Sequence, residues 1–225
     1  MNPHMPKISI VVATYNRPQT ILRQLSIVNN QLRIHLRDKV EVIIVDDGSD
    51  YGPEKIREEI RNGKWHMSIQ YIYRERAAGN VSRVYSSRNI AFSNSSGDII
   101  LQLDDDVTFH ERQLSEIQNL AASWNFFAPT LDWLWCPRIS NNIDRANSSE
   151  MEDDRSGFHR GPDGLWRDGK VHWSQVCWPS CDSSMMVCPR RTWERIGGYD
   201  EQFDGSMGAS DQEFALRVQK IGGVV

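Results

Sequence analysis

Long hydrophobic runs are missing from this sequence. None of its 225 residues belongs to an apolar stretch that approaches the roughly 18 to 20 residues of a membrane-spanning helix. The first residues also lack the charged-then-apolar order of a secretory signal, because the apolar run Ile8–Ala13 is too short. We therefore expect a cytoplasmic protein without a transmembrane segment. This expectation is still compatible with peripheral contact with a membrane.

A strong excess of one charge is missing as well. The 26 basic and 30 acidic residues leave a formal net charge of −4. Such a small charge provides no general attraction to nucleic acid or to an anionic membrane surface. A nucleic-acid partner is therefore not expected.

Cysteine is scarce and irregularly spaced. The four cysteines form no paired C-x-x-C pattern, and no His pair accompanies Cys177 and Cys181 as a zinc site of that spacing would need. Without a secretory signal, we expect reduced cysteines that pack as small hydrophobic residues. The other two are Cys136 and Cys188.

Short apolar runs alternate with segments of helical spacing, and the length of 225 residues favours a single domain. A strand that alternates regularly with a helix predicts a parallel α/β sheet. In open sheets of this kind, ligands bind beyond the carboxyl ends of the strands. We expect strands at Ile8–Ala13, Val40–Val45, Ser68–Arg74 and Ile99–Leu103, and helices at Pro18–Leu32, Pro53–Asn62, Val81–Asn94 and Glu111–Trp124.

The pattern is less regular in the second half of the chain. Asn141–Lys170 is rich in Asp, Asn, Ser and Gly and reads as a long irregular segment, which is usually either functional or disordered. A strand at Ser183–Cys188 and a short helix at Arg191–Ile196 are expected next. A last helix, Ser210–Ile221, is predicted to begin with a capping box in which Ser210 pairs with Glu213.

Polar clusters follow three of the predicted strands, at Thr14–Arg17, Asp46–Ser49 and Asp104–Asp106. Because parallel strands end at the same edge of a sheet, these clusters should converge. Three adjacent carboxylates repel one another, and a hard divalent cation such as Mn²⁺ or Mg²⁺ would relieve that repulsion. Strand alternation predicts that Asp104 and Asp106 point one way and Asp105 the other. A solvated acidic turn is the alternative.

Five motifs in this order resemble the inverting family 2 glycosyltransferases of the GT-A fold. The resemblance implies one α/β catalytic domain over residues 1–225, with a mostly parallel central sheet flanked by helices. Its Rossmann-like nucleotide-sugar-binding half would span about 7–107, and its acceptor-binding half, which carries the base, about 108–225. The motifs are Ile8–Pro18, Val42–Ser49, Arg88-Asn89 before Ser96–Asp106, Gly197–Glu201 and Ser210–Glu213.

The resemblance also implies roles for single residues. Thr14 and Asp47 would hold the nucleotide base and ribose, with Asp47 accepting a hydrogen bond from a uracil ring. Arg88 would lie near the donor nucleotide, and Asp106 would bind the metal ion. The complete donor-binding set is Thr14, Tyr15, Arg17, Asp46, Asp47, Arg88, Asp104 and Asp105.

Asp211 matches the general base of the family. Inversion at the anomeric carbon needs a base that deprotonates the acceptor hydroxyl as it attacks. A carboxylate at the start of a helix is stabilised by the helix dipole, although an ordinary acidic residue in a first turn would look the same. The family often supplies a further metal or diphosphate ligand downstream. This chain ends 14 residues after Asp211 without one, so either fewer protein ligands hold the ion or the chain is a catalytic domain truncated at its C-terminus.

The acceptor side is less defined. Trp178 can stack on a sugar ring, and Asp182 and Tyr199 can bond a hydroxyl, so these three residues are the acceptor candidates. The expected reaction moves a sugar from a nucleoside-diphosphate sugar, most simply a UDP-sugar, to a hydroxyl of a glycan, lipid carrier or protein.

Two other functions fit part of the sequence. Asp104-x-Asp106-x-Thr108 matches the signature of haloacid-dehalogenase-type phosphatases, in which Asp104 would be the nucleophile. That motif normally lies on the first strand, whereas here it follows the fourth. A non-catalytic module that binds a nucleotide sugar is the other alternative.

Overall fold

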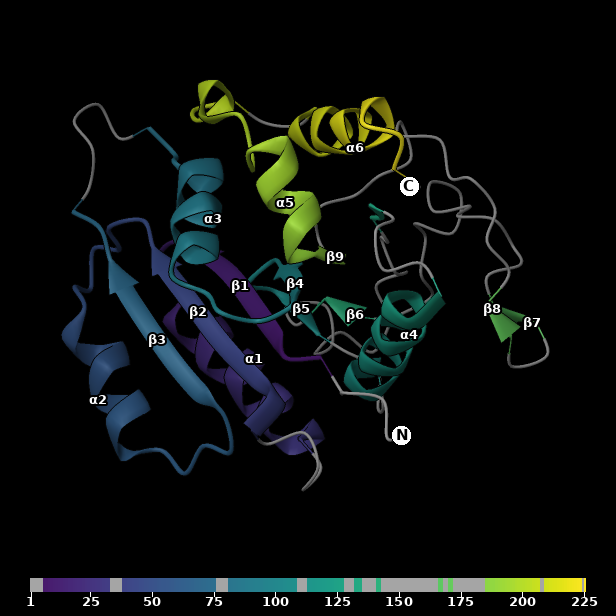
Figure 1. Cartoon of the computed structure of the whole chain (residues 1–225). Helices are drawn as coiled ribbons and strands as arrows, with labels where there is room; N and C mark the ends of the chain where they lie inside the picture. The colour runs from purple at the N-terminus through teal and green to yellow at the C-terminus, as the bar shows by residue number, and fades with distance from the viewer. Residues whose placement is uncertain are drawn as a thin grey trace.

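A five-stranded sheet with the strand order β3-β2-β1-β4-β9 organises the chain (Figure 1). The first four strands pair in parallel, and β9 runs antiparallel to β4. The predicted parallel α/β sheet is therefore confirmed, with one antiparallel edge strand added. The strands are β1 (Ile8–Thr14), β2 (Val40–Asp46), β3 (Ser68–Tyr73), β4 (Ile99–Leu103) and β9 (Met185–Pro189).

The computed structural model describes residues 6–32, 38–75, 81–108, 113–127, 132–134, 141–142, 166–167, 170–171, 185–206, 209–223 and 225. Every predicted helix is found there, with bounds that differ by no more than about three residues. The helices are α1 (Pro18–Gln31), α2 (Glu54–Asn62), α3 (Val84–Ser93), α4 (Gln113–Phe127), α5 (Arg190–Ile196) and α6 (Ser210–Lys220), with a 3₁₀ turn η5 (Glu201–Phe203).

Most of the segment predicted to be irregular, Asn141–Lys170, lies outside the described residues. Two short antiparallel pairs involve it. One joins β5 (Val107–Thr108) to β6 (Asn141–Asn142), and the other joins β7 (Trp166–Arg167) to β8 (Lys170–Val171).

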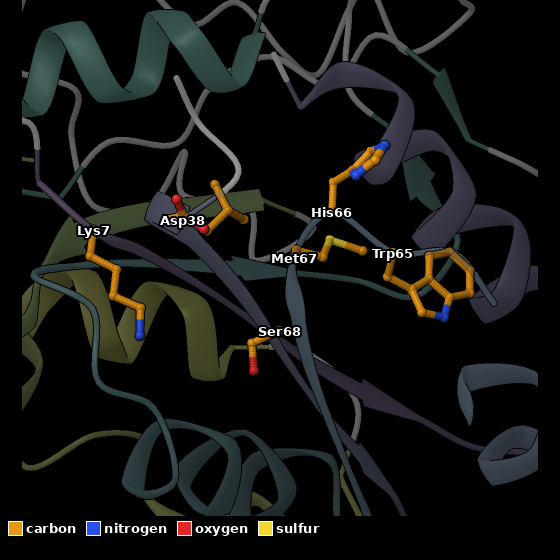
Figure 2. Close-up of a pocket in the computed structure, with 7 residues that line it drawn as sticks. Lys7, Asp38, Trp65, His66, Met67 and Ser68 are labelled. Atoms are coloured by element: carbon orange, nitrogen blue, oxygen red, sulfur yellow. The ribbon is translucent and has the colours of Figure 1, made fainter. Parts of the chain in front are cut away.

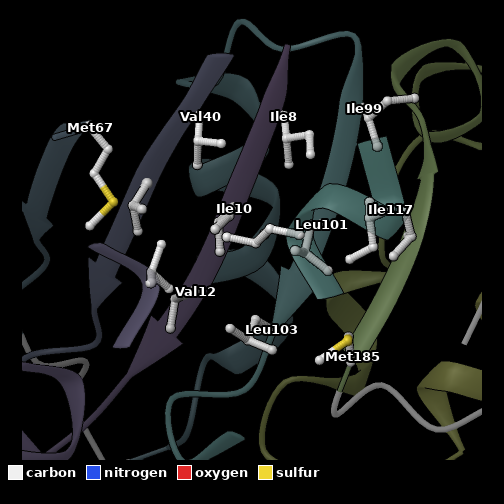
Figure 3. Packing of buried hydrophobic residues seen from close by; sticks show 14 of the residues in the cluster. Ile8, Ile10, Val12, Val40, Met67, Ile99, Leu101, Leu103, Ile117 and Met185 are labelled. Carbon is white, nitrogen blue, oxygen red and sulfur yellow. The ribbon is translucent and has the colours of Figure 1, made fainter. Parts of the chain in front are cut away.

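The central strands are buried on both faces, which explains their nearly continuous apolar sequence. Figure 3 shows the packing on one face, where Ile8, Ile10 and Val12 of β1 lie among Leu101, Leu103 and other apolar side chains. Helices α1, α2 and α4 cover this face, with Ile21, Leu25, Val28, Ile56, Leu114 and Ile117. Helices α3, α5 and α6 cover the other face, with Tyr85, Ala91, Trp193, Phe214 and Val218 (Figure 1).

A hollow of about 490 Å³ lies at the amino-terminal edge of the sheet (Figure 2). Lys7 precedes β1, Val40 begins β2 and Ser68 begins β3, and all three line it. The predicted ligand edge is the opposite one, so this hollow is not the predicted site. Within the described ranges, no helix is long and apolar enough to cross a membrane.

Candidate active site

The carboxyl ends of β1, β2 and β4 meet at one edge of the sheet, as the polar clusters predicted. Thr14 lies opposite Asp46 in the β1–β2 register. The Thr14 hydroxyl also donates a 2.7 Å hydrogen bond to Asp105 Oδ2, across 91 residues of sequence. The first and third clusters therefore touch directly.

Asp104, Asp105 and Asp106 do not alternate as a strand would require. Strand β4 ends at Leu103, and a turn follows in which the amide of Val107 donates to the Asp104 carbonyl at 3.2 Å. As a result, Asp105 and Asp106 both bond Arg17, whereas Asp104 bonds Arg88. The prediction that Asp104 and Asp106 share a direction is wrong, because the chain turns before the alternation can continue.

Gln24 on α1 supports this turn and was missed by the sequence analysis. Its amide nitrogen donates to the Asp104 carbonyl at 2.6 Å and to the Val107 carbonyl at 2.8 Å. Gln24 is buried on the apolar face of α1, between Ile21 and Leu25. A polar residue on an apolar helix face was the available signal, since a buried amide needs hydrogen-bond partners.

The acidic turn has perturbed carboxyl groups. Burial raises the pKa of Asp104 to about 6; the Arg88 charge opposes this effect, and repulsion from Asp106 and Asp105 adds to it. Burial also raises the pKa of Asp105, against a hydrogen bond from Thr14 and the charge of Arg17. These are the directions expected where like charges share a partly buried site.

Asp105 and Asp106 fit a cation. Asp105 Oδ1 and Asp106 Oδ2 both lie 2.9 Å from the same nitrogen, Arg17 Nη1, so the two oxygens converge on one positive centre. Carboxylate oxygens are the ligands that Mn²⁺ and Mg²⁺ prefer, and such ions commonly take one or two protein carboxylates plus substrate phosphates. The part of the chain that the structure describes holds no cluster of three or more ligating side chains.

Asp46 is buried, and its role is to hold the fold at this edge. Its Oδ1 accepts hydrogen bonds from the Ser49 amide and hydroxyl at 2.8 and 2.6 Å. Its Oδ2 accepts from the Tyr51 and Tyr71 hydroxyls at 2.9 and 2.6 Å. With 0% exposure and four protein donors, Asp46 cannot reach a donor nucleotide, so the prediction that it binds the donor is wrong.

Asp47 lies just beyond β2 and is held by Arg83. The Arg83 amide donates to Asp47 Oδ2 at 2.8 Å, and Arg83 Nε donates to Asp47 Oδ1 at 2.7 Å. Arg83 thus fixes, through two hydrogen bonds, the carboxylate that was expected to bind the base. Arg83 lies directly before α3, inside the range predicted to be helical, and nothing in the local sequence marked it as the partner of Asp47. Tyr15 follows Thr14 at the same edge and is half-buried.

Asp211 lies in the first turn of α6 and reaches the same edge. Its Oδ1 is 3.9 Å from Arg88 Nη1, and Arg88 Nη2 donates to Asp104 Oδ1 at 2.5 Å. The predicted capping box is absent: the residue before the helix is Ala209, at a φ of +66°, and Glu213 pairs with Arg217 instead. The capping prediction is therefore wrong, although the position of Asp211 in the first turn is confirmed.

The acceptor candidates receive little support. Tyr199 is 3% exposed and its hydroxyl donates to Gln102 Oε1 at 2.8 Å inside the core, so it offers no surface for an acceptor. Trp178 and Asp182 lie outside the described residues. Of the cysteines, Cys188 is buried and packs in the core as a small hydrophobic residue, as predicted, and the other three lie outside the described residues.

The sheet and its acidic edge define an α/β fold of the GT-A glycosyltransferase type. A Pyrobaculum calidifontis mannosyltransferase, PcManGT, in complex with GDP-Man and Mn²⁺, has a TM-score of 0.64 at 18% identity, covering 98% of this chain and 54% of that one. S. aureus TarS in complex with UDP-GlcNAc has a TM-score of 0.60 at 17% identity, covering 94% and 52%. Likeness at this identity shows the fold.

The family follows from sequence similarity. Residues 9–132, more than half of the chain, match the family described as Glycosyl transferase family 2, and the chain belongs to that family. It is 27% identical over 114 residues to glycosyltransferase AglE of Haloferax volcanii, covering 51% of this chain and 35% of AglE. It is 26% identical to validoxylamine A glucosyltransferase of Streptomyces hygroscopicus subsp. jinggangensis, covering 97% and 53%. The chain thus spans between about a third and about half of the length of these relatives.

Proposed function

We propose that this chain carries the catalytic centre of an inverting glycosyltransferase that uses a nucleoside-diphosphate sugar. The observation that supports this most directly is the meeting of Asp105, Asp106 and Asp211 at one sheet edge, with Arg88 between the acidic turn and Asp211. Family membership supports glycosyl transfer as the reaction class.

Asp211 is the proposed general base. As the acceptor oxygen bonds to the anomeric carbon, the bond from that carbon to the diphosphate oxygen breaks, and the hydroxyl proton passes to the Asp211 carboxylate. The departing group is the nucleoside diphosphate, and the transition state has oxocarbenium character. A side chain in the first turn of a helix is well suited to this, because the helix backbone fixes its position.

Asp105 and Asp106 are the proposed metal-binding residues, with Asp106 as the principal ligand. A bound Mn²⁺ or Mg²⁺ would offset negative charge on the diphosphate. Arg17, which bonds both carboxylates and whose side chain is 46% exposed, would then be available to the donor phosphates. The Mn²⁺ complex of a structural neighbour supports divalent metal use.

The proposed donor is a UDP-sugar. Asp47 and Thr14 would meet the nucleoside, because both stand at the carboxyl ends of adjacent strands. Arg83 orients the Asp47 carboxylate, which would accept a hydrogen bond from a base N–H. TarS is solved with UDP-GlcNAc and PcManGT with GDP-Man, so the fold by itself accommodates both nucleotides. The acceptor is proposed to be a hydroxyl on a glycan, lipid carrier or protein.

A thermal-shift panel of nucleotide sugars with and without Mn²⁺ or Mg²⁺, on the full-length protein, tests the donor site. A donor at one hundred times its dissociation constant stabilises the native state by about 2.7 kcal/mol. Asp106→Ala should abolish the metal-dependent part of the shift. If no nucleoside diphosphate raises the melting temperature with either metal, the donor site is wrong.

Asp211→Asn tests the base. This variant should bind the donor as tightly as the native protein and lose transfer. Glu213→Gln is the matched control, because Glu213 lies on the same helix and pairs with Arg217. Unchanged transfer in Asp211→Asn would remove Asp211 as the base. Tight donor binding without any turnover in the native protein would favour the non-catalytic module.

A further inference from the structure

Arg88 is a buried cation at the centre of the candidate active site. It lies in the middle of α3 and is 4% exposed. Its guanidinium stands 5.7 Å from the Tyr85 ring centre and 5.2 Å from the Tyr199 ring centre. The Tyr199 hydroxyl is itself bonded to Gln102, so the aromatic ring next to Arg88 is held in place. The position of the guanidinium is therefore set by the core.

The two terminal nitrogens of Arg88 have different environments. Nη2 donates to Asp104 Oδ1 at 2.5 Å. Nη1 is buried and has no hydrogen-bond partner within the described part of the chain, and Asp211 Oδ1 is 3.9 Å from it. A buried donor without a partner destabilises the folded protein. A small movement of the Asp211 carboxylate towards Nη1 would satisfy this donor.

We propose that Arg88 is a positioning residue that sets the Asp211 carboxylate against the acidic turn of Asp104. This inference rests on the proposed function, because it takes Asp211 to be the base. It also differs from the donor-contact role implied by family resemblance, since Arg88 Nη2 is already bonded to Asp104 and Nη1 faces Asp211.

The fork of the guanidinium explains why an arginine stands here. Two nitrogens of one rigid plane face two carboxylates that come from different elements, the end of β4 and the start of α6. A lysine carries its three N–H donors on a single nitrogen, so it cannot place donors at two positions as far apart as Nη1 and Nη2. Arg88→Lys keeps the charge but removes the geometric link between Asp104 and Asp211.

Steady-state kinetics and donor calorimetry on Arg88→Lys in the full-length protein test this role. We expect kcat to fall at least about tenfold, while the dissociation constant of the donor changes less than about threefold, because a misplaced base affects the reaction and not donor binding. Arg217→Lys is the matched control, since it alters another arginine–carboxylate pair on α6 and should leave kcat within about twofold.

A change in donor affinity without a change in kcat overturns the inference. If Arg88→Lys weakens donor binding and keeps kcat at saturation, Arg88 is a donor contact. If both constants are unchanged, Arg88 has no role in transfer. Should Arg88→Lys fail to fold, Arg88→Gln replaces it, because the amide can still donate to Asp104 but has no second nitrogen for Asp211. Unchanged kcat and unchanged donor affinity in that variant also overturn the inference.

Asp211→Asn separates this inference from the proposed function. If Asp211→Asn keeps full transfer, the assignment of the base fails whatever Arg88 does. If Asp211→Asn loses transfer and Arg88→Lys keeps it, only the positioning role fails.

Discussion

Glu41→Gln tests the network that fastens the amino-terminal edge of the sheet. Glu41 on β2 accepts hydrogen bonds from Lys7 Nζ at 2.5 Å, from the Ser9 hydroxyl at 2.6 Å and from the Ser96 amide at 2.6 Å. Burial by itself would raise the pKa of Glu41, but these donors lower it from 4.5 to about 2. The network therefore joins β1 and β2 to the turn before β4, the strand that leads to the acidic turn.

The expected loss follows from that pKa. A carboxyl whose pKa is lower in the folded state stabilises it fully above the unfolded pKa, and the stabilisation is lost as the pH falls towards the folded value. A fall from 4.5 to about 2 corresponds to about 3 kcal/mol at neutral pH. We expect Glu41→Gln to lower the free energy of unfolding by about 3 kcal/mol near pH 7 and by about 2 kcal/mol near pH 3.5.

Urea unfolding followed by tryptophan fluorescence at several pH values measures both numbers. Glu54→Gln is the matched control, because Glu54 pairs with Arg57 on the surface of α2 with its side chain 75% exposed. That variant should lose no more than about 0.5 kcal/mol. A Glu41→Gln loss as small as the control, or a loss that does not shrink as the pH falls, would refute the reasoning.

Two further substitutions test other contacts by chemical denaturation. Gly198→Ala should lower the free energy of unfolding by about 2 to 4 kcal/mol, because φ is +76° and a Cβ would lie 2.5 Å from Asn89 Oδ1. Gly197→Ala is the control: φ is +82° but a Cβ would meet nothing within 4 Å, so the loss should be only about 1 kcal/mol. Equal losses would contradict the crowding at Gly198. Tyr71→Phe should cost about 1 to 2 kcal/mol, because it removes a donor 2.6 Å from the buried Asp46 carboxylate; an unchanged midpoint would show that this bond is dispensable.

Adjacent aspartates at the end of β2 show where sequence reasoning stops. Asp46 and Asp47 look alike in the sequence, and both were predicted to bind the donor. Asp46 is the last residue of the strand and points to the face where Tyr51 and Tyr71 pack, so its carboxylate accepts hydrogen bonds inside the protein. Asp47 follows the strand and meets Arg83 instead. The difference depends on which face of the sheet each side chain joins.

The acidic turn makes the same point for Asp104, Asp105 and Asp106. Their place after the fourth strand could be read from the apolar run Ile99–Leu103, but their directions could not. Those directions depend on where β4 ends and on Gln24, which comes from a helix 80 residues earlier in the sequence.

The sequence by itself determined the order of strands and helices and the sheet edge at which the polar clusters meet, because hydrophobic periodicity is a property of neighbouring residues. Only the tertiary structure decided that β9 joins the sheet antiparallel to β4 and that Arg88 stands between Asp104 and Asp211. Such contacts join residues far apart in the chain. They depend on how α3 and α6 pack against one face of the sheet, which no local pattern records.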